Sequence, residues 1–358
     1  MSFFVSDQAP ANRVSGHKRR IALYCLGALL LLLLAVAMGA AIGETAIPLD
    51  VIGKTVANRI FGAAYTLDPI EEGIVWSYRI SRAIVAASCG AALAVSGAVL
   101  QSLLRNPLAD PYLLGLSAGA STGAVLVTVI GVGGGMVSLS FGAFWGAALA
   151  FGLVALLAKA AGGGVSAQGT GQIILAGIAG SQLFNALTSF IITRSANAEQ
   201  ARGIMFWLLG NLSGVRWDDV WLAVPVALGG VIVCIWHMRA LDAFAFGAES
   251  AASLGIPVRR VQVVLIAMTA LMTAVMVSLV GSIGFVGLVI PHAARFLVGV
   301  RHGRLLPVTA LTGAVFLVIA DIVSRTAIPG QVVPIGVITA LVGAPGFALI
   351  LIRGRSMR

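Results

Sequence analysis

The chain has 358 residues, of which only 10% are charged, and its mean hydropathy is +1.02. Because a soluble domain carries charged residues at roughly a quarter of its positions, this composition excludes a soluble globular fold. The formal net charge of +10 does not indicate nucleic-acid binding. The basic residues sit in short segments between apolar runs, where membrane topology places them, so we expect no nucleic-acid partner.

The apolar residues form long continuous runs rather than alternating patterns. A run of about 20 apolar residues spans a hydrocarbon core of about 30 Å. Continuous runs favour helices over the alternating strands of a membrane β-barrel. We therefore predict an all-α integral membrane protein with about ten transmembrane helices. Their expected ranges are 21–43, 80–104, 113–131, 138–160, 171–193, 218–237, 262–282, 285–299, 305–325 and 334–353.

Charge sets the expected orientation. The first apolar run is longer than the apolar region of about 7–15 residues in a signal peptide, which favours a retained helix after an N-terminal tail at 1–20. Most of the 23 Lys and Arg residues fall on the side of this tail, so both ends are predicted to be cytoplasmic. Residues 21–358 form a single transmembrane domain. In the longest outer segment, 44–79, the stretch Pro48–Gly62 can form a short surface helix.

Two matches to soluble-enzyme motifs lack the structure that their chemistry needs. Gly115–Gly119 fits the nucleophile-elbow pattern, but it opens an apolar helix instead of a strand-to-helix turn. Gly53–Thr55 resembles the end of a phosphate-binding loop, but Pro48 occupies the position of that loop's first glycine. We therefore expect neither a catalytic site nor an ATP site in this chain.

Candidate metal ligands are equally sparse. Cys25, Cys89 and Cys234 lie in or beside apolar runs without metal-ligand spacing, so we interpret them as small core residues. His292 has no second ligand at helical spacing. This favours a hydrogen bond to a neighbouring helix over a metal site. We expect no metal and no directly bound cofactor.

Small residues recur on two predicted helices. One face of 113–131 carries a repeat that lets helix backbones approach closely, formed by Gly115, Gly119 and Gly123. One face of 171–193 carries a small and polar stripe, formed by Gly177, Ser181, Asn185 and Ser189. Because an amide near mid-membrane is costly in lipid, we favour a role for this second stripe in lining a permeation pathway.

Prolines and glycines interrupt the later apolar runs. The run Asn106–Pro111 separates two helices with a short polar turn bracketed by prolines. Pro291 lies inside the predicted helix 285–299, and both Pro334–Gly336 and Gly343–Gly346 are expected to interrupt the last one. Interrupted helices mark cavities and moving parts in transporters.

The segment 239–261 is too polar to span the membrane and is predicted to face the cytoplasm. It is amphipathic and capable of forming a helix, with breaks at Gly247 and Gly255. Two interpretations are open from these residues alone. The segment can rest on the membrane surface as a helix, or it can dock a cytoplasmic partner.

Motifs over most of the chain follow the order of one transport family. They are Arg79–Arg82, Gly90–Gly97, Asn106–Pro111, Leu114–Gly119, Phe206–Gly210, Phe246-Gly247 with Leu254-Gly255, Gly284–His292, Ala320–Ile322, and Pro334–Val337 with Gly343–Pro345. The chain resembles the permease subunits of the FecCD family, type II ABC importers of vitamin B12, heme and ferric siderophores. Ser81 departs from the pattern, because the family usually has proline between the two arginines, and the start of the second helix is less well defined as a result.

The resemblance implies an assembly in the bacterial inner membrane. Two permease copies would form a homodimer with the pathway at their interface, surrounded by membrane lipid. Two cytoplasmic ATPase subunits would dock on the 240–258 loop, and a periplasmic substrate-binding protein would deliver the cargo. ATP and Mg²⁺ would bind to the ATPase partners, so the chain itself would be a translocation subunit and not an enzyme.

The family's functional positions carry over residue by residue. The resemblance assigns the ATPase coupling loop to Leu241, Phe244, Phe246, Gly247, Glu249, Leu254 and Gly255. It assigns binding-protein docking to Arg79, Arg82 and Arg325. Anchoring to lipid headgroups is the alternative for Arg79 and Arg82, and an internal pair with Asp321 is the alternative for Arg325. It assigns cytoplasmic gates to Asn106 and Leu108 and to Gly169 and Thr170, before the helix at 171–193, where simple connecting turns are the alternative.

The resemblance leaves the cargo open among three chelates. Family frequency alone favours a ferric siderophore, followed by heme and then cobalamin. The alternative from another class is a secondary transporter or channel without an ATPase. Such a protein needs no docking loop at 239–261, and proton coupling uses buried carboxylate chains, of which only Asp321 is present.

Overall fold

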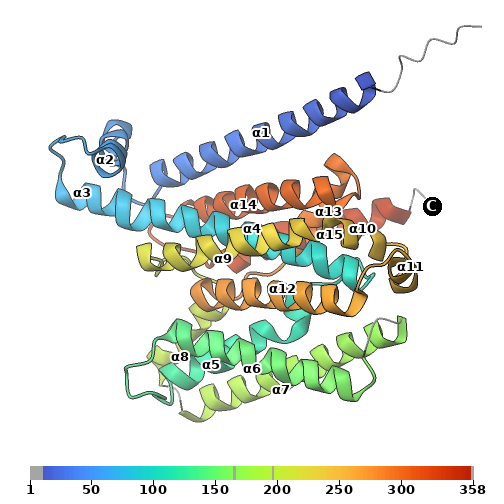
Figure 1. Ribbon diagram of the computed structural model, residues 1–358. Helices are drawn as coiled ribbons and strands as arrows, with labels where there is room; N and C mark the ends of the chain where they lie inside the picture. The colour runs from blue at the N-terminus through green and yellow to red at the C-terminus, as the bar shows by residue number, and fades with distance from the viewer. Residues whose placement is uncertain (1–10, 164–166, 196, 356–358) are drawn as a thin grey trace, which may run out of the picture.

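The computed structural model describes residues 11–163, 167–195 and 197–355, which fold into helices joined by short loops (Figure 1). Its helices are α1 (Ala11–Ala41), α2 (Leu49–Phe61), α3 (Pro69–Gly73), the π-helical η1 (Ile74–Ile80), α4 (Ser81–Leu103), the short η2 (Pro111–Leu114), α5 (Leu116–Thr128), α6 (Leu139–Ala160), α7 (Ala167–Ser195), α8 (Ala198–Leu208), α9 (Trp217–Trp236), α10 (Met238–Phe244), α11 (Ala248–Ser253), α12 (Val258–Val280), α13 (Val286–Val298), α14 (His302–Thr326) and α15 (Ile335–Arg355). In this described part, the only β-type pairing is an isolated bridge between Ile328 and Gln331.

The predicted all-α membrane fold is confirmed. Six of the described helical segments are long and apolar enough to cross a membrane, and shorter apolar helices lie in α1, α5, α13 and α15. Every predicted span contains one of these helices. The predicted surface helix at Pro48–Gly62 is also present as α2, which ends at Gly62 in the left-handed conformation (φ 68°).

The two ends of the bundle differ in what they carry. Figure 1 shows α2, α3 and α8 at one end, and α10, α11 and the C-terminal end of α15 at the other. Helix α1 begins at the same end as α10 and α11. This arrangement agrees with the predicted topology, in which both chain ends and the 239–261 segment lie on the cytoplasmic side.

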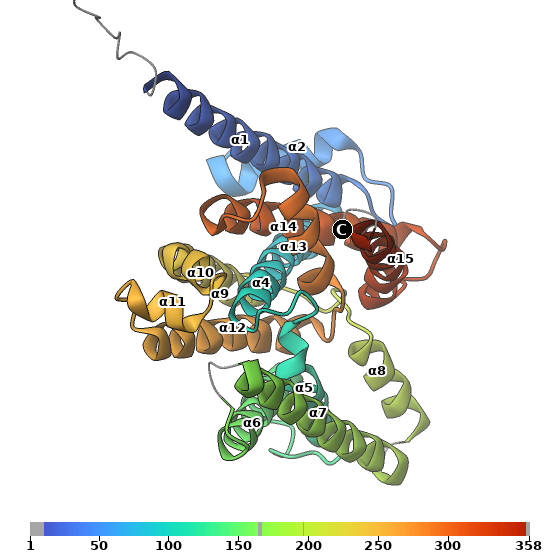
Figure 2. The ribbon, with the colours of Figure 1, turned by 90° about the vertical axis from the view of Figure 1, so that its right-hand side faces the viewer.

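Helix α4 runs through the middle of the bundle, surrounded by α9, α12, α13 and α14 (Figure 2). Glycines permit this close packing. Gly90 lies against the backbone of Gly313 in α14, and Gly97 lies against the backbone of Gly287 in α13, with no room for a Cβ at either position. Small residues are the usual means by which helices approach closely in a membrane.

The predicted glycine repeat on the third span is also confirmed as a packing surface. Gly119 of α5 meets the backbone of Gly146 in α6, and Gly123 meets Gly142 one turn further along. Gly115 instead takes a left-handed conformation (φ 78°) that ends η2 and starts α5. The glycine repeat on α5 therefore needs no functional explanation beyond helix packing.

Three expectations about helix ends and breaks are corrected. Helix α1 begins at Ala11 and so includes half of the predicted 1–20 tail. Helix α15 begins at Ile335, directly after Pro334, and is continuous across Gly343–Gly346 with Pro345 inside it, so neither expected interruption is present. Helix α8 was not expected, although Asn197 and Gln200 form a reciprocal capping box at its start.

Candidate functional site

The cytoplasmic segment 239–261 folds into two short helices. Helix α10 continues almost directly from α9, and α11 follows after Gly247, whose φ of 104° suits a residue without a side chain. Gly255, at φ 80°, turns the chain again before α12. The breaks predicted at both glycines are therefore present, and they produce a compact elbow outside the spans.

Six of the seven predicted coupling residues divide into a buried and an exposed group, and the seventh, Gly247, is half-buried at the break. Leu241 and Phe244 are buried, and they fix α10 to the bundle core. Phe246 is 80% exposed and Leu254 is 73% exposed, and Glu249 and Gly255 are exposed as well. The buried pair holds the elbow to the membrane domain, whereas the exposed side chains form an apolar surface with one acid on the cytoplasmic side.

A hydrogen-bonded chain ties this elbow to two membrane helices. Asp242 of α10 accepts hydrogen bonds through Oδ1 from the backbone N–H and from Nδ1 of His302, at 2.8 and 2.7 Å. His302 Nε2 lies 2.7 Å from the hydroxyl of Ser102 near the end of α4. Asp242 thus caps the positive N-terminus of α14, and the imidazole of His302 bridges α10 to α4.

The predicted gate between α4 and α5 is an ordered turn. The Asn106 side chain accepts a hydrogen bond from the backbone N–H of Leu108 at 2.9 Å, and Leu108 itself is exposed. Asp110 Oδ1 accepts from the backbone N–H of Tyr112 at 2.9 Å. Burial raises the pKa of the Asp110 carboxyl to about 6, and the hydrogen bond from Tyr112 acts in the opposite direction.

Tyr112 joins this turn to the break between α12 and α13. Its hydroxyl donates to the carbonyl of Ile283 at 3.0 Å and accepts from the N–H of the same residue at 2.9 Å. Phe285, which follows, has a left-handed backbone (φ 68°) and directly precedes α13. The two irregular segments therefore support each other's polar backbone groups.

The second predicted gate, at Gly169 and Thr170, lies in a helix and not in a connecting turn. Gly169 and Thr170 were expected in a turn before the helix, but α7 begins at Ala167, so both lie in its first turn. Gly169 is buried. The side chain of Thr170 lies outside the described residues. Gating at these positions stays a prediction.

The predicted polar stripe on α7 is only partly open. Gly177 is buried and packs against the carbonyl of Leu113, so it serves helix packing and lines no pathway in this subunit. Ser181 is half-buried, whereas Asn185 and Ser189 are exposed. Because a polar amide exposed to lipid is unfavourable, the end of α7 that carries Asn185 and Ser189 is suited to a water-filled path or a second protein surface.

At the outer end of the bundle, two arginines pair with one carboxylate, and a third arginine, Arg79, lies beside α1. Arg82 Nε donates to Asp321 Oδ1 at 2.7 Å, and Arg325 Nη2 lies 3.1 Å from Asp321 Oδ2. Arg82 also donates to the Ser213 hydroxyl at 3.2 Å. Arg79 is turned toward α1 and contacts no carboxylate. Within the described residues the cluster holds three cations and one anion.

Backbone carbonyls at the end of α1 supply the missing acceptors. Arg79 donates to the carbonyls of Ala40 and Ala41 at 3.2 and 3.0 Å, and it also contacts the Thr45 carbonyl. Arg325 donates to the carbonyls of residues 39 and 42 at 3.1 and 2.9 Å. Cations at a helix C-terminus are favourable because the last carbonyls are unpaired and the helix dipole is negative there.

The three arginines have partners inside the chain, and binding-protein docking by them stays a prediction. Arg79, Arg82 and Arg325 are only 5%, 9% and 6% exposed, and their donors are directed to partners inside the chain. The predicted competition from Asp321 is present and extends to two of the arginines. The cluster therefore joins α1, η1, α4 and α14 at the outer face.

The remaining polar candidates also have structural partners. His292 Nδ1 donates to the carbonyl of Leu288 in its own helix at 2.9 Å. The hydrogen bond is therefore made within α13 and not, as expected, to a neighbouring helix. Cys89 and Cys234 are free and buried, as small core residues should be, whereas the side chain of Cys25 lies outside the described part. Among the residues described, no three His, Cys, Asp or Glu side chains gather as metal ligands.

A bundle of membrane-crossing helices, with an apolar elbow on one face and irregular backbone inside, defines a multi-pass membrane permease. The model of the FecCD transport family matches residues 28–353, and the chain belongs to this family. It is a permease subunit of the ABC importer class in the bacterial inner membrane.

Several relatives are similar over most of their length. The cobalamin import system permease protein BtuC of Halobacterium salinarum is 43% identical over 80% of this chain and 74% of its own. The ABC transporter permease protein YvrB of Bacillus subtilis is 38% identical over 97% and 99%. The vitamin B12 import system permease protein BtuC of Escherichia coli is 39% identical over 80% and 86%.

Solved structures support the same fold. A metal-chelate type ABC transporter in an inward-facing conformation matches with a TM-score of 0.78 and 29% identity, covering 92% of this chain and 98% of that one. The PsaBC structure from Streptococcus pneumoniae has a TM-score of 0.56 at 19% identity, which shows likeness of fold alone.

Proposed function

We propose that this chain is the translocation subunit of an importer for cobalamin or a closely related corrinoid, driven by ATPase partners. The relatives named for cobalamin or vitamin B12 import carry the proposal of cargo, at 39% to 43% identity over 80% of the chain. Family frequency had favoured a ferric siderophore, followed by heme. Both are proposed here only after cobalamin.

The cargo is tested with the complex and its cognate binding protein. Uptake into proteoliposomes is measured with cyanocobalamin, a ferric hydroxamate siderophore and hemin at equal concentrations, with ATP enclosed on the cytoplasmic side. We expect ATP-dependent accumulation of cyanocobalamin and background levels of the other two. Uptake of the siderophore or hemin without cyanocobalamin would overturn the proposed cargo and leave the importer class intact.

We infer that the α10–α11 elbow docks one ATPase subunit per permease chain, which would bind ATP and Mg²⁺. The observation that supports this most directly is the division between buried and exposed apolar residues. Leu241 and Phe244 hold the elbow in place, while Phe246 and Leu254 present apolar surface on the cytoplasmic side. A helix that only rests on lipid needs no such rigid attachment to the bundle core.

Docking is tested by replacing Phe246 with alanine. Interface aromatics commonly contribute about 2 kcal/mol or more to binding, so the affinity for the ATPase subunit should fall by about tenfold or more. Phe61 is an ideal matched control, because it is also 80% exposed but lies in α2 on the outer face. Equal affinities for Phe246→Ala, Phe61→Ala and the wild type would end the docking assignment.

We also propose that two copies pair as a homodimer, with the exposed end of α7 facing the shared pathway. Asn185 and Ser189 supply the support, since they are polar and exposed on a helix that crosses the membrane. Disulfide crosslinking of Asn185→Cys in membranes should give a covalent dimer. A control cysteine at Leu149, exposed on α6, should remain monomeric, and equal crosslinking at both positions would reject this interface.

A further inference from the structure

A cavity of about 620 Å³ lies between α4, α6, α7 and α12, near the cytoplasmic ends of α4 and α6. Its wall is mainly aliphatic and aromatic and includes Leu100, Leu104, Phe151, Val154, Ile173 and Ile266. Lys159, Arg259 and Gln262 are its polar side chains, and the rest of the wall offers ordered water few of the two to four polar partners that each molecule needs. The cavity therefore suits an apolar occupant.

Two cations line the same cavity. Lys159 lies in the last turn of α6 and Arg259 in the first turn of α12, and both line the cavity. Both side chains are exposed, and neither forms an ion pair within the part of the chain that the structure describes. No Asp or Glu is present in the cavity wall. An apolar cavity with two unpaired cations in its wall is complementary to an amphipathic anion.

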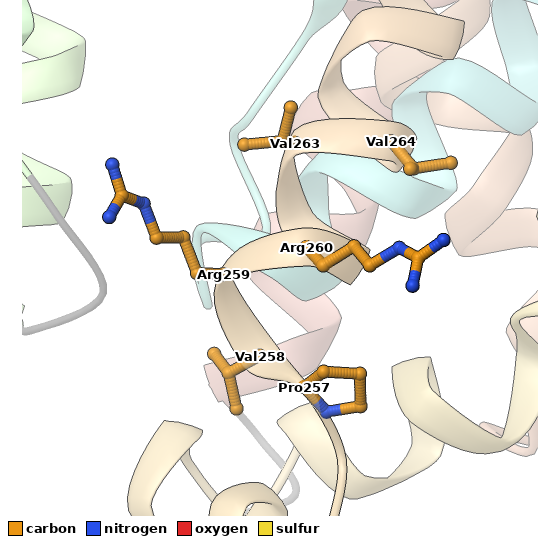
Figure 3. Close-up of a pocket in the computed structure, with 6 residues that line it drawn as sticks. All are labelled: Pro257, Val258, Arg259, Arg260, Val263 and Val264. Atoms are coloured by element: carbon orange, nitrogen blue, oxygen red, sulfur yellow. The ribbon is translucent and has the colours of Figure 1, made fainter.

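Of the two adjacent arginines at the start of α12, only Arg259 lines this cavity, although both line a smaller pocket beside it. Figure 3 shows Arg259 and Arg260 leaving opposite sides of the first turn of α12. Arg259 contributes to the cavity that also contains Lys159, whereas Arg260 lies beside His237 on the other side of the helix. Arg260 therefore provides a control of equal charge that lies outside the cavity lined by Lys159.

We propose that this cavity binds an anionic phospholipid of the cytoplasmic leaflet, with an acyl chain among the apolar side chains and its phosphate at Lys159 and Arg259. In the predicted topology, Lys159 and Arg259 lie at the cytoplasmic ends of α6 and α12, and basic pockets between helices on that side attract lipid headgroups. A free phosphate ion would use the two cations but not the apolar wall. A neutral lipid would use the wall but not the cations.

Binding at this position would stabilise the packing of the bundle. Helix α12 packs against α4, the central helix, and against α6. The cavity occupies the space that these helices enclose together with α7. A lipid chain there would fill space that side chains leave open, and the cavity's lining atoms would regain dispersion contacts. Loss of the lipid should therefore lower stability without any change in the ATPase docking surface.

The test measures lipid retained by the intact permease. The full chain is purified in mild detergent, and bound phospholipid is quantified by native mass spectrometry and by extraction. We expect phosphatidylglycerol or cardiolipin to be retained by the wild type and by Arg260→Gln. Lys159→Gln combined with Arg259→Gln should reduce retention by about tenfold or more, as expected for the loss of charge-assisted contacts.

A second variant guards against misfolding of the first. Ala155 lines the cavity, and Ala155→Trp should displace the lipid while it leaves both cations in place. Vesicles of phosphatidylglycerol should raise the apparent melting midpoint of delipidated wild type, and phosphatidylcholine vesicles or inorganic phosphate should not. Equal retention in all variants, equal stabilisation by phosphatidylcholine, or full stabilisation by inorganic phosphate would each overturn the proposal.

Discussion

The outer arginine cluster makes a quantitative prediction through Asp321. This carboxylate is fully buried, and it is the only acid that contacts Arg82 and Arg325 in the described structure. Asp321→Asn keeps the shape of the side chain but leaves the buried guanidinium groups without a counter-charge. Breaking a buried pair by removing one partner costs about 3–5 kcal/mol, and the carbonyls of α1 offset only part of this loss. We expect a melting midpoint lower by several degrees.

The assay is thermal unfolding of purified permease in one detergent at one pH, with the apparent midpoints compared between variants. Asp50→Asn is the matched control, since Asp50 pairs with Lys54 at 2.9 Å on the exposed face of α2. Exposed pairs of this kind contribute little to stability, so its midpoint should equal that of the wild type. If Asp321→Asn were as stable as Asp50→Asn, the carbonyls alone would satisfy the arginines, and the charge argument would fail.

Three further changes test other parts of the structure. His302→Ala breaks the link between α10 and α4, so more ATP should be hydrolysed per cargo molecule transported. Asp242→Asn keeps an acceptor for the α14 N-terminus and should have a smaller effect. If both variants and the wild type hydrolysed the same amount of ATP per cargo molecule, the link would have no part in coupling. Gly97→Val meets the backbone of α13 and should lower stability by about 1–3 kcal/mol or more, measured against Gly152→Val, where the added group meets open space. Asp110 has a folded-state pKa of about 6 against an ordinary 3.8, so its ionised form destabilises the fold. Asp110→Asn should therefore raise the melting midpoint at about pH 7.5 but not near pH 4. A difference in melting midpoint between variant and wild type that did not depend on pH would contradict this.

The spans and their order were predictable because they depend on short-range properties of the sequence. Hydropathy over about 20 residues defines each crossing, and the positive-inside rule defines its direction. The polarity of the segment around Gly247 and Gly255 predicted that it does not span the membrane, and the two glycines predicted the breaks within it. Helix α8 was the exception. Its signal was present in the capping residues Asn197 and Gln200, but an amphipathic helix between two spans leaves no hydropathy peak.

The partners of individual side chains were not predictable in the same way. Sequence predicted a membrane face for Arg79, but depth along the membrane normal does not say whether a side chain points outward or inward. Its acceptors lie in α1, 38 and 39 residues away. His302 contacts Asp242 and Ser102 across separations of 60 and 200 residues. No local spacing encodes such contacts, because they arise only when helices distant in sequence pack together.

These contacts have a mechanical consequence for α4 and α14. The two helices are joined at the outer end by Arg82 and Asp321, in the middle by Gly90 and Gly313, and at the inner end through His302. Because close-packed elements move as units, a displacement of α10 passes to both helices together through Asp242. Helix α7 packs mainly against α5, α6 and η2, outside the α4–α14 pair. Since elements without rigid ties to one another rearrange at lower cost, the opening of a pathway should involve α7 moving against a rigid α4–α14 pair.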